Sequence, residues 1–266
     1  MRFVVSPGRE GRRMAAAAAA CFALGAAGCA SDSTGLGLRL VPEEQVVAMG
    51  QQSWEQLRQQ EPASKNAAYQ RTAQQVAARL LTASGRNPAE WEVVVFASQE
   101  VNAFALPNKK IGVYEGMMKL AAGEAELAAV MGHEIGHVDE NHAAERVNSQ
   151  AATELGIGLA GAALGATSGT DPQAVSALLG LGAQYGLLLP YSRNQELEAD
   201  RLGLYSMAAA GYNPRAAITL WQKMEAQGGR PPVFMSTHPG PDQRIQRFEQ
   251  LMPEALRIYQ RSGKAG

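Results

Sequence analysis

Two histidines one helical turn apart, with a glutamate directly after the first, are the residues best placed to do chemistry. Residues 133–137 have the sequence HEIGH inside a long helical pattern, so His133 and His137 project from one face and can share a metal ion. Imidazole nitrogens suit zinc, and catalytic zinc typically has three protein ligands and a water. Glu134, about 100° round the helix from His133, would lie beside that water as the general base. A chance match on an amphipathic helix is the alternative, but it is expected on the order of 1% of the time at ordinary residue frequencies. The pattern therefore favours zinc-dependent hydrolysis.

A third ligand should come from a second helix, and residues 193–210 offer carboxylates there. Glu196 is the expected zinc ligand, on the side opposite the two histidines. Asp200 lies on the same face one turn later and could accept a hydrogen bond from a ligand imidazole, which fixes the orientation of the ring. Glu198 points elsewhere and fits a solvated acidic face. That description is the alternative for all three carboxylates, and the histidine pair tips the balance towards a site.

The remaining two histidines have weaker signals. His238 lies in a loop before a proline, with Arg244 six residues later at a helix start, and loops carry function disproportionately. His142 is nine residues after His133, which is half a turn round a continuous helix. We therefore expect His142 to face away from the metal, as a structural or solvent-exposed residue.

The elements that must position these side chains are mostly helices. Amphipathic spacing and capping signals predict helices over 43–60, from beyond Pro62 to before Gly85, and over 124–147, 193–210, 214–227 and 241–259. Branched and aromatic runs predict strands over 91–97, 101–106 and 110–114, the last two joined by a turn at 107–109. The expected fold class is α+β, mainly helical, with a small β-sheet.

Residues 155–190 are apolar and rich in glycine and alanine, with a polar interruption at 168–172. Each apolar half is shorter than the roughly 20 residues that a membrane-spanning helix needs. We expect a buried or lid-like helical hairpin here, with partial membrane contact as the alternative.

The N-terminal residues differ from the rest. Arginines, an apolar run over 14–24 and the small residues 25–28 precede Cys29, which is the order of a secretory signal. Small residues directly before a cysteine resemble a lipoprotein cleavage site, so we expect a signal peptide over 1–28 and lipidation of Cys29. Ordinary signal-peptide cleavage nearby is the alternative. Residues 29–42 would then be a flexible tether, 43–260 one catalytic domain and 261–266 a tail.

Composition narrows the class of protein. The net charge is −1 and aromatic residues make up 6% of the chain, so no basic face for nucleic acid is expected. The only other cysteine, Cys21, lies inside the predicted signal peptide. A processed chain would therefore have neither a disulfide nor a cysteine metal site.

Together these motifs resemble the zinc metallopeptidases of the HtpX, BepA and LoiP type, family forty-eight of the metallopeptidases and relatives of the CAAX prenyl endopeptidases. The resemblance runs from about Val46 to Leu251 and is closest to the small LoiP-like outer-membrane lipoproteins. It rests on NAFALP at 102–107, ELAAV at 126–130, HEIGH at 133–137, YSR at 191–193 with ELEAD at 196–200, and STHP at 236–239 with Arg244.

The resemblance implies a gluzincin-like domain with one Zn²⁺ per chain. It implies His133, His137 and Glu196 as ligands and Glu134 as the base, with Asp200 behind the ligands. His238 would be a switchable, regulatory extra ligand, and Arg244 would lie near the site. The segment Asn102, Ala103, Phe104, Ala105 resembles the edge strand that faces the cleft and pairs with the substrate backbone.

Two functions fit this sequence. The first is an endopeptidase on the periplasmic side of the cell envelope, anchored to the outer membrane through Cys29, that cleaves unfolded or misassembled envelope proteins. The second is a non-enzymatic envelope assembly factor with a structural or regulatory zinc site. Glu134 favours the enzyme, because a structural site needs no carboxylate beside an open position.

Overall fold

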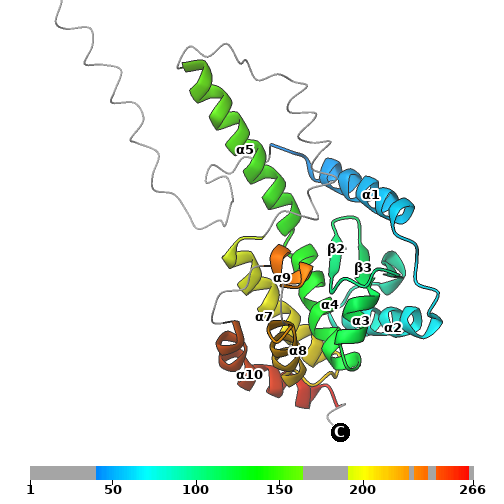
Figure 1. Cartoon of the computed structure of the whole chain (residues 1–266). Coiled ribbons are helices and arrows are strands. Elements are labelled where there is room, and N and C mark those ends of the chain that lie inside the picture. The colour runs from blue at the N-terminus through cyan, green and yellow to red at the C-terminus, as the bar shows by residue number, and fades with distance from the viewer. Residues whose placement is uncertain (1–39, 164–190, 228–230, 239–243, 264–266) are drawn as a thin grey trace, which may run out of the picture.

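The computed structural model describes residues 40–163, 191–227, 231–238 and 244–263 (Figure 1). The α-helices are α1 (Glu43–Gln60), α2 (Ala67–Ala83), α3 (Glu115–Leu120), α4 (Glu124–Asp139), α5 (His142–Ala163), α7 (Arg193–Ala209), α8 (Arg215–Glu225), α9 (Val233–Thr237) and α10 (Arg244–Arg261). A 3-10 turn, η1 (Pro88–Glu90), precedes strand β1 (Glu92–Phe96), and β2 (Ala103–Leu106) and β3 (Lys110–Tyr114) follow. The predicted class, mainly helical with a small sheet, is confirmed. The short α3 and α9 were not predicted.

The three strands form one sheet in the order β1-β3-β2, with β2 at an edge. β2 and β3 are the predicted hairpin: they pair antiparallel, with Ala103 opposite Val113. The turn between them is completed by Lys109, which has a φ of 62°. β1 joins the other side of β3 in parallel, so that a crossover rather than a hairpin links it to its neighbour.

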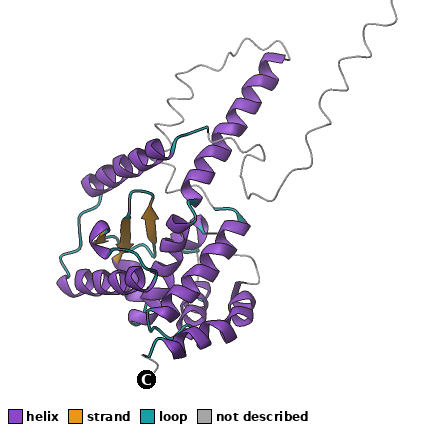
Figure 2. Ribbon diagram, turned by 180° about the vertical axis from the view of Figure 1, so that it is seen from behind, coloured by secondary structure: helices purple, strands orange, loops and turns teal. Residues whose placement is uncertain are grey.

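The two faces of the sheet are buried against different partners. The inner face, which includes Val95, Ile111 and Val113, belongs to the main core together with side chains of α2 and α4. The outer face has a separate aromatic cluster, made up of Trp54, Phe96, Phe104, Leu106 and Tyr114. Trp54 comes from α1 and meets Phe96 edge-on with the ring centroids 5.5 Å apart. This cluster attaches α1 to the sheet, where Figure 2 shows that helix on the outer side of the strands.

Helix α4 is the central element of the body and is buried from Glu126 to His137. Small residues let α7 approach it closely. A β-carbon added at Gly203 would lie 2.6 Å from the backbone nitrogen of His133, and one added at Gly136 would lie 3.2 Å from the carbonyl oxygen of Ala199. The two helices therefore cross nearly backbone to backbone, which sets the short distance between the side chains that they direct at each other.

The prediction of a single helix over 124–147 is wrong. α4 ends at Asp139 and α5 begins at His142, so the chain changes direction between them. Asn141 has a φ of 56°, and asparagine is one of the few residues that adopt this left-handed conformation readily. The amide of Asn141 donates to the carbonyl of Val138, which closes the turn. The apolar periodicity continues across 124–147, so the sequence pattern does not reveal the break, which depends on the backbone conformation of Asn141 alone.

Helix α5 extends away from the rest of the described fold (Figure 1). It contains residues 155–163, the start of the predicted apolar hairpin, whereas 164–190 lie outside the described residues. The predicted signal peptide, Cys29 and most of the predicted tether also lie outside them. Among the helices that the structure describes, none is both long and apolar enough to cross a membrane.

Candidate active site

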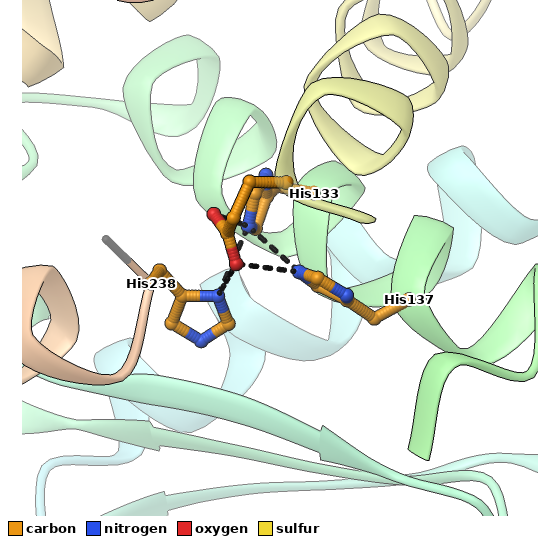
Figure 3. Close-up of side chains that lie close together, drawn as sticks. His133, His137 and His238 are labelled. Atoms are coloured by element: carbon orange, nitrogen blue, oxygen red, sulfur yellow. Dashed lines mark hydrogen bonds and ion pairs between the residues drawn. The ribbon is translucent and has the colours of Figure 1, made fainter. Parts of the chain in front are cut away.

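His133 and His137 project from one face of α4, as their spacing predicts, and both are buried. Their Nε2 atoms lie 3.0 Å apart and the rings meet edge to face. The imidazole of His238, which follows α9, completes the group: its Nδ1 lies 3.2 Å from Nε2 of His133. Figure 3 shows the three rings converging on one point.

Glu196, on α7, brings a carboxylate to the same point. Its Oε1 lies 3.4 Å from Nε2 of His137 and 3.1 Å from Nδ1 of His238, and its Oε2 lies 3.4 Å from Nε2 of His133. One ligand atom from each of these four residues lies within 4.8 Å of the others. The predicted third ligand is therefore beside the histidine pair, and His238 adds a fourth donor.

The donor set fits zinc. Three imidazole nitrogens and a carboxylate are ligands that Zn²⁺ takes, at distances of about 2.0–2.2 Å. Nε2 of His133 lies 3.0 Å and 3.2 Å from the facing nitrogens of His137 and His238, so the three rings can direct lone pairs at one point beside the carboxylate. A cation at their centre satisfies all of them at once.

Electrostatics favour a positive charge at the same point. Burial opposes the charged form of His133, but the carboxylates of Glu196 and Asp200 outweigh it and raise the pKa of His133 to about 10. Burial would also raise the pKa of Glu196, yet the neighbouring imidazoles hold it well below its usual range. At His137, burial prevails and lowers the pKa well below the ordinary value. The carboxylates of Glu196 and Asp200 therefore favour a positive charge at this buried point.

Asp200 and Arg244 stand behind the ligands. Asp200 Oδ1 lies 2.9 Å from Nδ1 of His133, which leaves Nε2 of that ring for the metal. Arg244 donates from Nε to Oδ2 of Asp200 at 2.6 Å and from a terminal nitrogen to Oε2 of Glu196. Its guanidinium lies over the ring of Trp221, 4.0 Å from the centroid. Arg244 is buried, and its geometry is that of a residue that positions two carboxylates.

Glu134 is almost fully buried and lies between the cluster and the edge strand. The backbone amide of Ala105, in β2, donates to its Oε2 at 3.1 Å. Its Oε1 lies 3.3 Å from Nε2 of His238 and makes no hydrogen bond within the described part of the chain. Burial raises the pKa of Glu134. One carboxylate oxygen is therefore fixed by the sheet, while the other faces the ligand group.

A cavity of about 270 Å³ opens beside Glu134 and His238. The four predicted substrate-strand residues, Asn102, Ala103, Phe104 and Ala105, all line it. Side chains of α1, Arg146 of α5 and Tyr191 make up much of the remaining wall. The predicted edge strand thus borders a cleft that ends at the ligand cluster.

The prediction that His142 faces away from the histidine pair is wrong, and so is the alternative that it is exposed to solvent. It is 1% exposed, and its Nδ1 lies 2.9 Å from Nδ1 of His137. Burial lowers its pKa. Because the helix breaks at Asn141, the ring turns back towards His137 instead of facing away from it. Glu198, the predicted solvated carboxylate, has a partly exposed side chain, and its Oε2 lies 3.5 Å from Nε2 of His142.

Tyr191 was assigned no role from the sequence, although it lies in the YSR motif. Its ring stacks on His137 with the centroids 3.8 Å apart. Arg146 lies over the ring of Tyr191, 3.9 Å from its centroid, and burial raises the pKa of Tyr191 to about 12. Tyr191 is therefore a neutral wall of the cleft that holds one ligand ring in place.

Comparison with known proteins decides the family. The profile of peptidase family M48 matches residues 65–252, which include every element that contributes to the cluster. The chain belongs to peptidase family M48. The predicted family and the predicted zinc cofactor are thereby confirmed, and the closer resemblance to the LoiP-like lipoproteins stays a prediction.

This M48 chain is similar in sequence to several curated metalloendopeptidases and proteases. It is 39% identical over 180 residues to the mitochondrial metalloendopeptidase OMA1 of Schizosaccharomyces pombe, a match that covers 66% of this chain and 51% of the relative. It is 33% identical to human OMA1, a match that covers 65% of this chain and 34% of the relative. It is 30% identical to the beta-barrel assembly-enhancing protease of Escherichia coli, and that match covers 66% of this chain and 38% of the relative. The chain thus spans about half or less of the curated relatives that it matches.

Proposed function

We propose that this M48 chain is an endopeptidase that hydrolyses peptide bonds within unfolded protein chains, with His133, His137 and Glu196 as the zinc ligands. The observation that carries the proposal is the convergence of these three side chains beside Glu134, whose Oε1 faces the cluster at 3.3 Å from His238. A structural zinc site would not need a carboxylate that faces the ligand group without being a ligand and without orienting one from behind.

Zinc, when bound, would supply a Lewis acid that polarises the scissile carbonyl and lowers the pKa of the attacking water. Glu134 would take the proton of that water and pass it to the leaving amine. The raised pKa of Glu134 suits both steps, because a carboxyl group that is too acidic holds a proton poorly. The amide of Ala105 holds the other oxygen, so that the base keeps its orientation through the proton transfers.

The edge of β2 is the proposed binding strand. β2 pairs with β3 on one side, and the segment from Asn102 to Ala105 lines the cleft. An extended substrate segment can add to such an edge through main-chain hydrogen bonds, which select for extended backbone rather than for particular side chains. This mode favours unfolded or misassembled proteins as substrates, because their backbone is free to pair.

One observation favours the alternative of an assembly factor with a structural or regulatory zinc site. With His238 in place, the cluster has four protein donors, the number that closes a structural site. His238 comes from the short segment after α9, whereas the other three donors come from long helices.

We propose that His238 is a regulatory ligand that leaves when substrate enters.

A mutation of the base tests the enzyme. Glu134→Gln should retain one zinc per chain and lose cleavage of a casein-type unfolded protein by about 10²- to 10⁴-fold, the usual contribution of a general base. Metal content and cleavage rate are measured on the same preparations. Glu249→Gln, the same change at an exposed position of α10, should match the parent. Parent-like cleavage by Glu134→Gln would exclude the mechanism.

We also propose that the chain acts in quality control at the cell envelope, held to the outer membrane by lipid on Cys29. The signal-like order of residues 1–28 supports this, and one relative is named a beta-barrel assembly-enhancing protease. In a bacterial host, Cys29→Ala should move the protein from the membrane fraction to the soluble fraction, because the anchor is lost. Unchanged membrane association would reject the anchor and point to the 155–190 segment instead.

A further inference from the structure

The two histidines of α4 differ in what holds their second nitrogen. His133 has a carboxylate there, from Asp200. His137 has an imidazole: Nδ1 of His142 lies 2.9 Å from its Nδ1, and both rings are buried. Beyond His142, a carboxylate oxygen of Glu198 lies 3.5 Å from Nε2. A chain of groups therefore leads from the ligand cluster to the partly exposed surface of α7.

The direction of the hydrogen bond between the two rings follows from the cluster. Nε2 of His137 points at the other donors, 3.0 Å from Nε2 of His133 and 3.4 Å from Glu196. A neutral imidazole that gives Nε2 to a metal has its proton on Nδ1. His137 must then donate from Nδ1, and the Nδ1 of His142 must accept. The proton of His142 is left on Nε2, on the side of the Glu198 carboxylate.

We propose that His142 is a positioning residue for the zinc site: by accepting the Nδ1–H of His137 it fixes the tautomer and the ring orientation of that ligand. This inference rests on the zinc site of the proposed function. Groups in this position usually matter for metal affinity, because a ligand ring that is free to rotate binds less tightly. Tyr191 fixes the plane of the same ring by stacking, and it offers no acceptor to Nδ1 in the contacts described.

The break between α4 and α5 makes this contact. Had the helix continued, His142 would lie about 140° round the axis from His137, too far for the rings to meet. Asn141, with a φ of 56°, turns the chain so that His142 opens α5 directly beside the end of α4. The positioning role therefore depends on the backbone conformation of Asn141 as well as on the imidazole.

Zinc affinity of the full chain, measured by competition with a chelator, tests the proposal. His142→Leu removes the acceptor and should weaken zinc binding by about 10- to 100-fold. In His142→Asn the side-chain oxygen takes the place of Nδ1 and can accept the same hydrogen bond, so the affinity should stay within about threefold of the parent. Unfolding temperatures of the metal-free proteins show whether each variant is folded.

A second pair of variants acts through the backbone alone. Asn141→Gly permits the left-handed conformation and should bind zinc like the parent. Asn141→Val disfavours this conformation and should therefore weaken zinc binding, as His142→Leu does. This variant still tests the proposal if His142→Leu does not fold.

The outcomes separate the two proposals. Parent-like zinc affinity in His142→Leu, or equal losses in His142→Leu and His142→Asn, would overturn the positioning role, since the second result means that only packing matters. A parent that binds no zinc would reject the zinc site itself, and with it the proposed function.

Discussion

At the scale of single residues, His238 has contacts that conflict with catalysis. Its Nδ1 lies 3.1 Å from Glu196, and its Nε2 lies 3.3 Å from Glu134. In this position the ring stands between the ligand cluster and the base, where the attacking water and the scissile carbonyl have to fit. Phe234 stacks on the ring with the centroids 4.5 Å apart, so the closed position is supported by packing. This arrangement supports the proposal that His238 is a regulatory ligand that restrains the enzyme.

Substitution of His238 should remove that restraint. His238→Ala should retain zinc through the other three ligands and cleave unfolded protein faster, by up to roughly tenfold if a minor open state of about 10% becomes the whole population. Steady-state cleavage and metal content are the measurements. Ser236→Ala, an exposed change on α9, is the control. Unchanged or slower cleavage by His238→Ala would contradict the regulatory role.

At the scale of elements, the crossing of α4 and α7 decides the site. Glu196 and Asp200 reach the histidines because α7 lies nearly against the backbone of α4. Gly203 is at the closest point: an added β-carbon would meet the nitrogen of His133 at 2.6 Å and the carbonyl carbon of Gly132 at 2.9 Å. These neighbours are backbone atoms, so a side chain at 203 can be accommodated only by moving the helices apart.

Gly203→Ala should therefore lower both stability and zinc affinity. Overpacking of this kind costs about 1–3 kcal/mol in the free energy of unfolding, partly offset by up to about 1 kcal/mol of helix propensity. Urea unfolding and chelator competition measure the two effects. Arg201→Ala, at an exposed position of the same helix, should stay within about 0.5 kcal/mol of the parent. A Gly203→Ala protein with parent-like zinc affinity would show that the helices adjust without disturbing the ligands.

At the scale of the whole molecule, a bound metal would connect distant parts of the chain. The four donors come from α4, α7 and the segment after α9, and groups of α5 and α10 stand behind them. The unfolded chain has no such cluster. Zinc should therefore bind the folded state far better than the unfolded one, and binding should stabilise the entire described body.

Removal of the metal should thus lower the unfolding temperature. Free zinc at 100 times its dissociation constant adds about 2.7 kcal/mol, which corresponds to roughly 5–10 °C for a domain of this size. Differential scanning calorimetry with and without a chelator measures the shift. His137→Ala, which lacks one ligand, should show a much smaller difference. Equal unfolding temperatures of the parent with and without zinc would contradict this linkage.

Local spacing in the sequence determined the parts of the site that one helix can present. His133, Glu134 and His137 lie within five consecutive residues, and the geometry of a helix turn places them without reference to the rest of the chain. The same holds for Glu196 and Asp200, one turn apart on α7. Hydrophobic periodicity also predicted the main helices, because it reports which side of a helix is buried, and branched and aromatic runs predicted the three strands.

Only the tertiary structure decided which of these faces meet, and how closely. The contact of His142 with His137 depends on one left-handed residue, Asn141, inside a pattern that is periodic on both sides of it. The hydrogen bond from Ala105 to Glu134 joins a strand edge to a helix across 29 positions, and Arg244 reaches Glu196 across 48. Such contacts arise from the packing of whole elements, which short-range spacing does not encode.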